Sequence, residues 1–252
     1  MSDPGAETRS PDTPRAQLCG ARRITAALDT GEPVRLLLAR KGALSAATAE
    51  LLTRARGAGI PVRMAGEREL ARLAIPGRDG EVLALVGGDP RASVDEMLQA
   101  GGAVWLLVGV AYVRNAGYAI RCAEVSGASG IAIDAELSRS AQREACRAAM
   151  RADRFFPVHF CPADALVSQA RGHGLRVVAI EDVGTRAPWE VDLTGPALFI
   201  VGGEGGGIPR SLLDRSDCVV RLPMRGFIPS YNLQAAMAAI AGERLRQLQM
   251  RA

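Results

Sequence analysis

The sequence has few residues that bind metals, and none of the spacings at which they usually do so. It contains two histidines, His159 and His173, and five cysteines that lie far apart, with no Cys-x-x-Cys pair. An odd number of dispersed cysteines argues against a disulfide framework and against a zinc site. We therefore expect a protein that holds no metal.

Long apolar runs and lysines are also scarce. No apolar stretch approaches the roughly 18 residues needed to span a membrane, and the first twenty residues lack the apolar core of a signal peptide. These two absences predict a cytoplasmic protein without a membrane segment. Lys41 is the only lysine, so the positive charge behind the formal net charge of +4 comes almost entirely from arginine. Arginine suits phosphate recognition, and this charge permits an anionic partner such as RNA.

The most distinctive stretch is rich in glycine and lies near the C-terminus. An apolar run over residues 197–201 predicts a buried strand, which leads into Gly202, Gly203, Glu204 and three further glycines. Glycines let a backbone turn sharply and bring its N–H groups close to a ligand. The stretch is not a dinucleotide fingerprint, which needs a third glycine where Ile208 stands, and it is not a P-loop, which needs Gly-Lys-Ser/Thr. A glycine-rich turn that binds no ligand is the alternative interpretation.

Short apolar strands alternate with helices along most of the chain, which predicts an α/β fold with a largely parallel sheet. Residues 1–17 are rich in Ser, Pro, Asp and Thr, and we expect them to be a disordered tail. Residues 18–88 form a small α/β unit without an acid–base pair, which indicates a binding module. Residues 89–102 are expected to be a linker, and residues 103–252 a second α/β domain.

The second domain is expected to gather its functional residues at one edge of the sheet. Residues 104–110 predict a strand, Asn115 and Gly117 a turn from strand to helix, and residues 118–126 the helix that follows. Ligands of parallel sheets bind at the C-terminal ends of the strands. The segments expected around this crevice are Asn115, Glu181, residues 202–207 and residues 222–224.

Three stretches of this domain together resemble the SpoU/TrmH branch of the SPOUT methyltransferases. Residues 115–124, NAGYAIRCAE, are similar to the family pattern N-x-G-x-x-x-R-x-A. Residues 201–208, VGGEGGGI, and residues 219–224, VVRLPM, are similar to its G-x-E-G-x-G and I-P-M. Residues 228–238, IPSYNLQAAMA, are similar to its S-L-N-V-S-x-A. Each stretch alone is a weak signal, whereas their order and spacing together are strong.

The resemblance implies a fold, a cofactor and a reaction. It implies a C-terminal domain with a deep trefoil knot at about residues 197–232, a homodimer, and S-adenosylmethionine as the methyl donor to a ribose 2′-hydroxyl of RNA. More loosely, residues 18–86 resemble the L30e-like substrate-binding domain that precedes several rRNA methyltransferases of this family. This module favours rRNA over tRNA as the substrate, as in the self-resistance enzymes of antibiotic producers that the chain resembles.

The resemblance also implies roles for individual residues. Arg121 matches the catalytic arginine. Arginine is effectively never deprotonated. We therefore expect Arg121 to bind an RNA phosphate and align the hydroxyl, and we consider true base catalysis less suited to it. The alternative is a surface ion pair of Arg121 with Glu124 or Glu144. Asn115 would hold Arg121 or the RNA backbone. The other residues implied in catalysis are Glu204, Ser230 and Asn232, and those implied in cofactor binding are Ile180, Gly202, Gly203, Gly205, Leu222, Met224 and Leu233.

Some residues allow other interpretations or depart from the family pattern. Ser230 and Asn232 also suit the N-cap of a last helix over residues 232–248. Tyr231 replaces a usual leucine and Gln234 a usual second serine, while Phe227 and Pro229 crowd the approach to this motif. The N-terminal unit has Arg78-Asp79-Gly80 where the family usually has His-Gln-Gly. Two alternatives follow: a methyltransferase that acts on a small molecule or another non-ribose target, and an inactive RNA-binding homologue.

Overall fold

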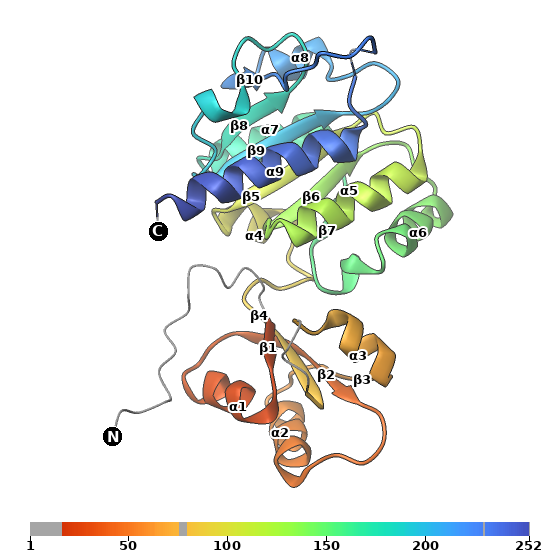
Figure 1. Ribbon diagram of the computed structural model, residues 1–252, viewed down its shortest axis with the longest axis vertical. Coiled ribbons are helices and arrows are strands. Elements are labelled where there is room, and N and C mark those ends of the chain that lie inside the picture. The colour runs from red at the N-terminus through yellow and green to blue at the C-terminus, as the bar shows by residue number, and fades with distance from the viewer. Residues whose placement is uncertain (1–16, 76–79, 229, 252) are drawn as a thin grey trace. The chain divides into compact units, whose positions relative to one another are not determined.

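The computed structural model describes residues 17–75, 80–228 and 230–251. The expected disordered tail (apart from Gln17), Arg78, Asp79 and Pro229 therefore lie outside the described residues. Contacts between residues divide the chain into two units, which meet in the sequence between Asp89 and Pro90 (Figure 1). Each unit has its own sheet.

The N-terminal unit is a four-stranded mixed sheet in the order β1-β4-β2-β3, in which only β2 and β3 run parallel. The inner strand β4 is apolar throughout and β2 is apolar over residues 36–39. Two helices pack their apolar faces on the same core, which contains Ile24, Leu37, Leu51 and Val82. The elements are β1 (Gln17–Cys19), α1 (Ala21–Asp29), β2 (Val34–Arg40), α2 (Ala46–Gly57), β3 (Val62–Ala65), α3 (Glu67–Leu73) and β4 (Val82–Val86).

Glu81, which directly precedes β4, ties this strand to the beginning of α2. Its Oε2 accepts hydrogen bonds from the Ser45 backbone N–H (3.0 Å), the Ser45 hydroxyl (2.7 Å) and the Thr48 hydroxyl (2.9 Å). Arg40 donates to Oε1 at 3.0 Å. The hydrogen bonds from the Ser45 backbone and hydroxyl are the largest causes that lower the pKa of Glu81 from 4.5 to about 2.

We expect Glu81 to make the N-terminal unit sensitive to acid. A carboxylate whose pKa is lower in the folded state contributes its full stability above its unfolded pKa, and this contribution is lost as the pH falls from 4.5 towards 2. Glu81→Gln should remove this part of the pH dependence of amide hydrogen exchange in α2. Glu50→Gln, an exposed change on the same helix, should leave it. A wild-type acid profile in Glu81→Gln would contradict the assignment.

The C-terminal unit is a six-stranded sheet in which every pair of neighbours is parallel, in the order β10-β8-β9-β5-β6-β7. This confirms the predicted parallel α/β architecture. The strands are β5 (Ala103–Val108), β6 (Gly130–Asp134), β7 (Val158–Phe160), β8 (Arg176–Ile180), β9 (Ala197–Gly202) and β10 (Cys218–Val220).

Helices cover both faces of this sheet, which explains why its central strands are apolar throughout. On one face lie α5 and α9 (Figure 1), and on the other α4 packs against α7. The helical elements are α4 (Val94–Gln99), α5 (Val113–Val125), α6 (Arg139–Ala148), η1 (Ala152–Arg154), α7 (Ala163–Gly172), η2 (Pro188–Glu190), α8 (Arg210–Leu213) and α9 (Leu233–Gln249).

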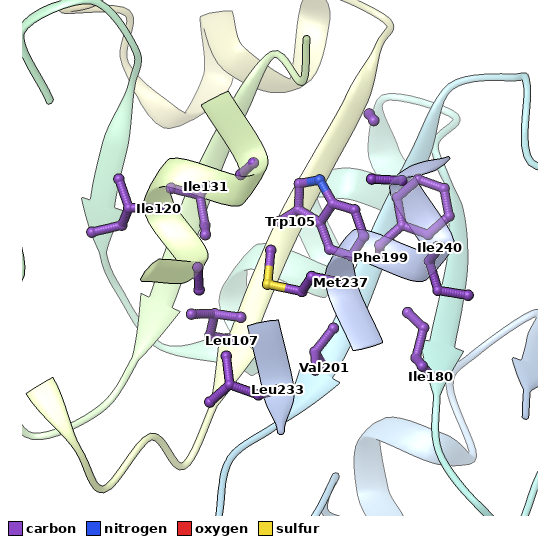
Figure 2. Packing of buried hydrophobic residues seen from close by; sticks show 14 of the residues in the cluster. Trp105, Leu107, Ile120, Ile131, Ile180, Phe199, Val201, Leu233, Met237 and Ile240 are labelled. Atoms are coloured by element: carbon purple, nitrogen blue, oxygen red, sulfur yellow. The ribbon is translucent and has the colours of Figure 1, made fainter. Parts of the chain in front are cut away.

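Alternate residues of β5 and β9 enter two separate cores, as the period of a strand requires. Trp105 and Phe199 face α5 and α9, and their ring centroids lie 5.0 Å apart. Figure 2 shows Met237 and Ile240 of α9 against these rings. The residues between them, such as Leu106, face α4 and α7. Met97 and Leu98 belong to this second core, so α4 packs within the unit although it falls in the stretch expected to be a linker.

The helix α5 begins earlier than the sequence indicates. Asn115 and Gly117, expected in a turn, lie inside the helix, and the turn after β5 is made by Gly109 at φ +67. Gly117 is present for packing, because a Cβ there would lie 2.6 Å from the Ala145 carbonyl oxygen of α6. The trefoil knot implied over residues 197–232 stays a prediction. Among the described residues, no helix has the length and apolarity to cross a bilayer.

Candidate active site

A pocket of about 440 Å³ opens at the C-terminal ends of β8 and β9, inside the C-terminal unit. The glycine-rich loop after β9 forms one wall, and the segment from Leu222 to the first turn of α9 forms the other. Nine of the residues predicted for the site line this pocket: Ile180, Gly202, Gly203, Glu204, Leu222, Met224, Ser230, Asn232 and Leu233.

The glycine-rich loop is folded so tightly that no side chain fits at three of its positions, Gly202, Gly203 and Gly207. The Gly203 N–H donates to the Val108 carbonyl at 2.7 Å, and a Cβ on Gly203 would overlap the Gly109 carbonyl oxygen. A Cβ on Gly202 would lie 2.5 Å from the Gly207 carbonyl carbon. Gly207 itself has φ +66, a conformation that side chains rarely adopt. These glycines allow the loop to lie directly against the end of β5.

Glu204 joins this loop to the beginning of α5. One carboxylate oxygen accepts a hydrogen bond from the Asn115 side-chain amide, and the other accepts one from the Ala111 backbone N–H at 3.0 Å. Asn115 thus holds Glu204, whereas the resemblance suggested that it would hold Arg121 or RNA. Asn115 of the first motif and Glu204 of the second are 89 residues apart in the sequence and meet at the pocket through this carboxylate.

Glu181 holds the other end of the loop. It follows β8 directly, and its Oε2 accepts a hydrogen bond from the Ile208 N–H at 2.8 Å. The same oxygen would be 2.6 Å from a Cβ on Gly207, so the glycine is required for this contact. Asp182 lines the pocket beside Glu181, and its backbone N–H donates to Glu181 Oε1 at 3.2 Å.

The opposite wall contains the third motif. Asn232 is the N-cap of α9, with its Oδ1 accepting from the Gln234 N–H at 3.4 Å, which confirms the capping interpretation for this residue. Ser230 is not the cap; its hydroxyl donates to the Tyr231 carbonyl at 3.3 Å. The Tyr231 hydroxyl donates to the Pro223 carbonyl at 3.1 Å, which fixes the ring at the rim of the pocket.

Arg121 lies on α5 but does not line the pocket. Its side chain is exposed, on a stripe of the helix that also contains Arg114, Tyr118 and Val125. Within the part of the chain that the structure describes, no hydrogen bond or ion pair involves its guanidinium, so the ion pairs considered with Glu124 and Glu144 are not formed. An exposed arginine without a partner among the described residues can bind an anionic ligand.

Asn115 contacts the site only through Glu204, and Gly205 does not line the pocket. Glu181 and Gly207, expected around the crevice, line the pocket. The position of Glu181 directly after a buried strand of a parallel sheet is the signal that predicts it. The lining residues that were not predicted for the site are Asp182, Val201, Ile228, Tyr231 and Ala236. The described residues contain no cluster of His, Cys, Asp and Glu that could hold a metal ion.

We predict that Glu181→Ala weakens ligand binding in this pocket by loosening the glycine-rich loop. A hydrogen bond to a charged group contributes about 1.5–3 kcal/mol, which corresponds to roughly 10- to 100-fold in affinity. Glu181→Gln keeps an acceptor for the Ile208 N–H and should retain most of the affinity. Asp182→Ala removes a neighbouring carboxylate of the same pocket without touching the loop. Affinity is measured by calorimetry. Equal losses of affinity in Glu181→Ala and Asp182→Ala would show that binding depends on the negative charge of the pocket and not on the position of the loop.

Comparisons with known proteins agree with this geometry. The family model described as "SpoU rRNA Methylase family" matches residues 103–242. The 23S rRNA (guanosine-2′-O-)-methyltransferase RlmB of Pseudomonas syringae is 32% identical over 169 residues, which cover 62% of this chain and 64% of that protein. An uncharacterized tRNA/rRNA methyltransferase of a Mycobacterium species is 34% identical, over 62% of this chain and 52% of that protein. The chain thus spans less than two thirds of the length of these two relatives.

A solved structure with a bound cofactor is also similar. The SpoU methyltransferase AviRb from Streptomyces viridochromogenes, in complex with AdoMet, is 25% identical with a TM-score of 0.56. The similarity covers 92% of this chain and 89% of that chain, so it includes both units. The match to the family model extends over more than half of the chain and contains all three motifs. The chain therefore belongs to the SpoU rRNA methylase family.

Proposed function

We propose that this protein transfers a methyl group from S-adenosylmethionine to a ribose 2′-hydroxyl of RNA, and that the RNA is ribosomal. The observation that carries the proposal is the pocket itself, which gathers residues of the second and third motifs and reaches the first through Glu204 and Asn115. The relatives support the substrate, because RlmB is named for methylation of 23S rRNA.

The residues of the pocket suit this cofactor. Its volume falls within the range of small-molecule sites, which are lined by apolar side chains with a few polar groups. Ile180, Leu222 and Leu233 provide apolar walls for an adenine ring. Gly203 and Met224 line the same space. The carboxylates of Glu181, Asp182 and Glu204, which also line the pocket, suit a ligand with a positive sulfonium. The AviRb structure contains this cofactor.

The chain's own groups would then bind and orient the RNA. When bound, S-adenosylmethionine supplies an electrophilic methyl group that needs no metal. Arg121 binds an RNA phosphate and aligns the 2′-hydroxyl, a poor nucleophile that requires orientation or deprotonation. Glu204, held by Asn115, fixes the loop between this helix and the pocket. Ser230 and Asn232 shape the opposite wall.

We assign residues 18–88 to an L30e-like module that binds RNA, residues 89–102 to the connection, and residues 103–252 to the catalytic domain. The module exposes Arg22, Arg68 and Arg72 on α1 and α3, which suit phosphate contacts. We also propose a homodimer, because α5 exposes Tyr118 (46%) and Val125 (57%) on the stripe that contains Arg121. Light scattering of the full-length protein would measure its mass.

Radiolabelled methyl transfer tests the reaction and the substrate class together. The full-length protein is incubated with labelled S-adenosylmethionine and, separately, with unmodified rRNA, tRNA and a small-molecule extract. Label in the rRNA fraction, at a nucleotide that resists alkaline hydrolysis on its 3′ side, supports 2′-O-methylation of rRNA. Label only in small molecules would support the alternative substrate. Cofactor binding with no transfer to any fraction would support an inactive RNA-binding homologue.

A further inference from the structure

The rim of the pocket carries three exposed apolar side chains that the methyl-transfer chemistry does not use. Phe227 is fully exposed (102%), Ile228 is 76% exposed and Tyr231 is 50% exposed. We call these three residues the aromatic rim. Ile228 and Tyr231 also line the pocket, and Phe227 adjoins Ile228 in the chain. Single exposed apolar residues are common on protein surfaces, but three within five positions beside a pocket indicate a binding surface.

One member of the aromatic rim, Tyr231, is held by a hydrogen bond. The Tyr231 hydroxyl donates to the Pro223 carbonyl at 3.1 Å, across eight positions of the chain. This bond uses the polar end of the ring and leaves its face free. Among the residues that the structure describes, no ring contact involves either Phe227 or Tyr231, and at least half of each side chain is exposed.

Positive charge accompanies the aromatic rim. Arg221 and Arg225 lie within a few positions of Phe227 and are exposed. No hydrogen bond or ion pair to a described residue involves the Arg225 guanidinium. Exposed aromatic rings beside cationic groups are the combination that binds single-stranded nucleic acid, because bases stack on the rings while the cations contact phosphates.

We infer that the aromatic rim is a stacking platform for a nucleobase of the RNA substrate, with the Phe227 ring as its main contact and Arg225 on an adjacent phosphate. This inference rests on the proposed function, since it assigns the RNA to the mouth of the same pocket. A ribose can reach the pocket only if its nucleotide leaves the neighbouring stack, and stacking on Phe227 compensates for the lost contact. Phe227 and Tyr231 both depart from or lie outside the family motifs, so the platform is a specificity determinant of this chain.

The test measures binding of two short oligonucleotides to the full-length protein saturated with S-adenosylhomocysteine, which prevents turnover. One is a single-stranded RNA with 2-aminopurine at its centre, whose fluorescence is quenched by stacking. The other has an abasic site at that position and the same phosphates. We expect Phe227→Ala to weaken the first by roughly 5- to 100-fold and to reduce its quenching, and to leave the second unchanged. Phe227→Leu should behave as alanine, whereas Phe227→Trp keeps the wild-type affinity.

Matched controls separate stacking from charge and from a protein interface. Trp189→Ala removes another exposed aromatic side chain (60%) that does not line the pocket, and should change neither oligonucleotide. Arg225→Gln should weaken both and reduce the salt dependence by about one phosphate contact. Equal weakening of both oligonucleotides by Phe227→Ala, no weakening, or a changed mass in light scattering would each overturn the inference. Methyl transfer to rRNA by the wild type is measured in parallel. If the wild type transfers the methyl group but Phe227→Ala binds both oligonucleotides normally, the stacking inference fails while the proposed function stands.

Discussion

Arg121→Ala is expected to slow methyl transfer strongly while the protein stays folded and binds its cofactor. The guanidinium is exposed and outside the pocket, and none of the described residues pairs with it. Its removal therefore breaks no contact that stabilises the fold, and surface substitutions of this kind change stability by about 0.5 kcal/mol at most. A role in aligning the reacting hydroxyl predicts instead a loss in kcat on the order of 10²–10³-fold, as for other groups that orient or stabilise a transition state.

The measurement compares Arg121→Ala with Arg114→Ala, which removes the same charge from the same exposed stripe of α5. Single-turnover rates, RNA affinity and thermal unfolding are recorded for both. Arg114→Ala should lower RNA affinity alone, because it removes a positive charge but keeps the Arg121 guanidinium that aligns the 2′-hydroxyl. Arg121→Lys tests the geometry, since lysine keeps the charge but not the bidentate fork. If both alanine variants lost the same activity, Arg121 would serve general electrostatic attraction and not alignment.

The parts of the fold that sequence predicts well are those decided locally. The strand predicted over residues 197–201 is an apolar run followed by glycines, and β9 appears there, over Ala197–Gly202. The start of α5 is different, because Asn115 and Gly117 are poor helix formers. The packing of α5 on α6 decides that this segment is helical, because a residue without a side chain must face Ala145. The short strand β1 forms through pairing with β4, more than 60 positions away in the sequence, and has no local pattern.

The candidate site shows the same division. The three motifs identify most residues of the pocket because each function needs particular side chains at fixed spacing. Contacts between one motif and another cannot be predicted from the spacing of residues within each motif. Glu204 meets Asn115 only because β9 pairs with β5 in parallel register, and Glu181 reaches Ile208 only because β8 lies on the other side of β9. Sequence thus indicates which residues act, and the sheet order determines which of them support one another.

Gly203→Ala is expected to have the largest effect of any single methyl group added to this protein. A Cβ at this position would overlap the carbonyl oxygen of Gly109 and lie 2.8 Å from the Val110 nitrogen. Both are backbone atoms at the end of β5, so no flexible side chain can move aside. The loop must shift instead, which strains or breaks the bond from the Gly203 N–H to the Val108 carbonyl. Overpacking of this kind costs about 1–3 kcal/mol.

Gly206→Ala is the matched control, because it adds the same methyl group to the same loop, with nothing within 4 Å of the new Cβ and with a backbone φ outside the left-handed region. Gly203→Ala should lower the thermal midpoint and, by moving a wall of the pocket, weaken S-adenosylmethionine binding by roughly 5- to 100-fold, which corresponds to a cost of about 1–3 kcal/mol. Gly206→Ala should leave both near the wild-type values. Calorimetric titration with the cofactor distinguishes two causes. A lower thermal midpoint with normal affinity would mean that the loop supports the fold but does not form the binding wall. A loss of affinity confined to Gly203→Ala would show that cofactor binding requires the close approach of the loop to β5.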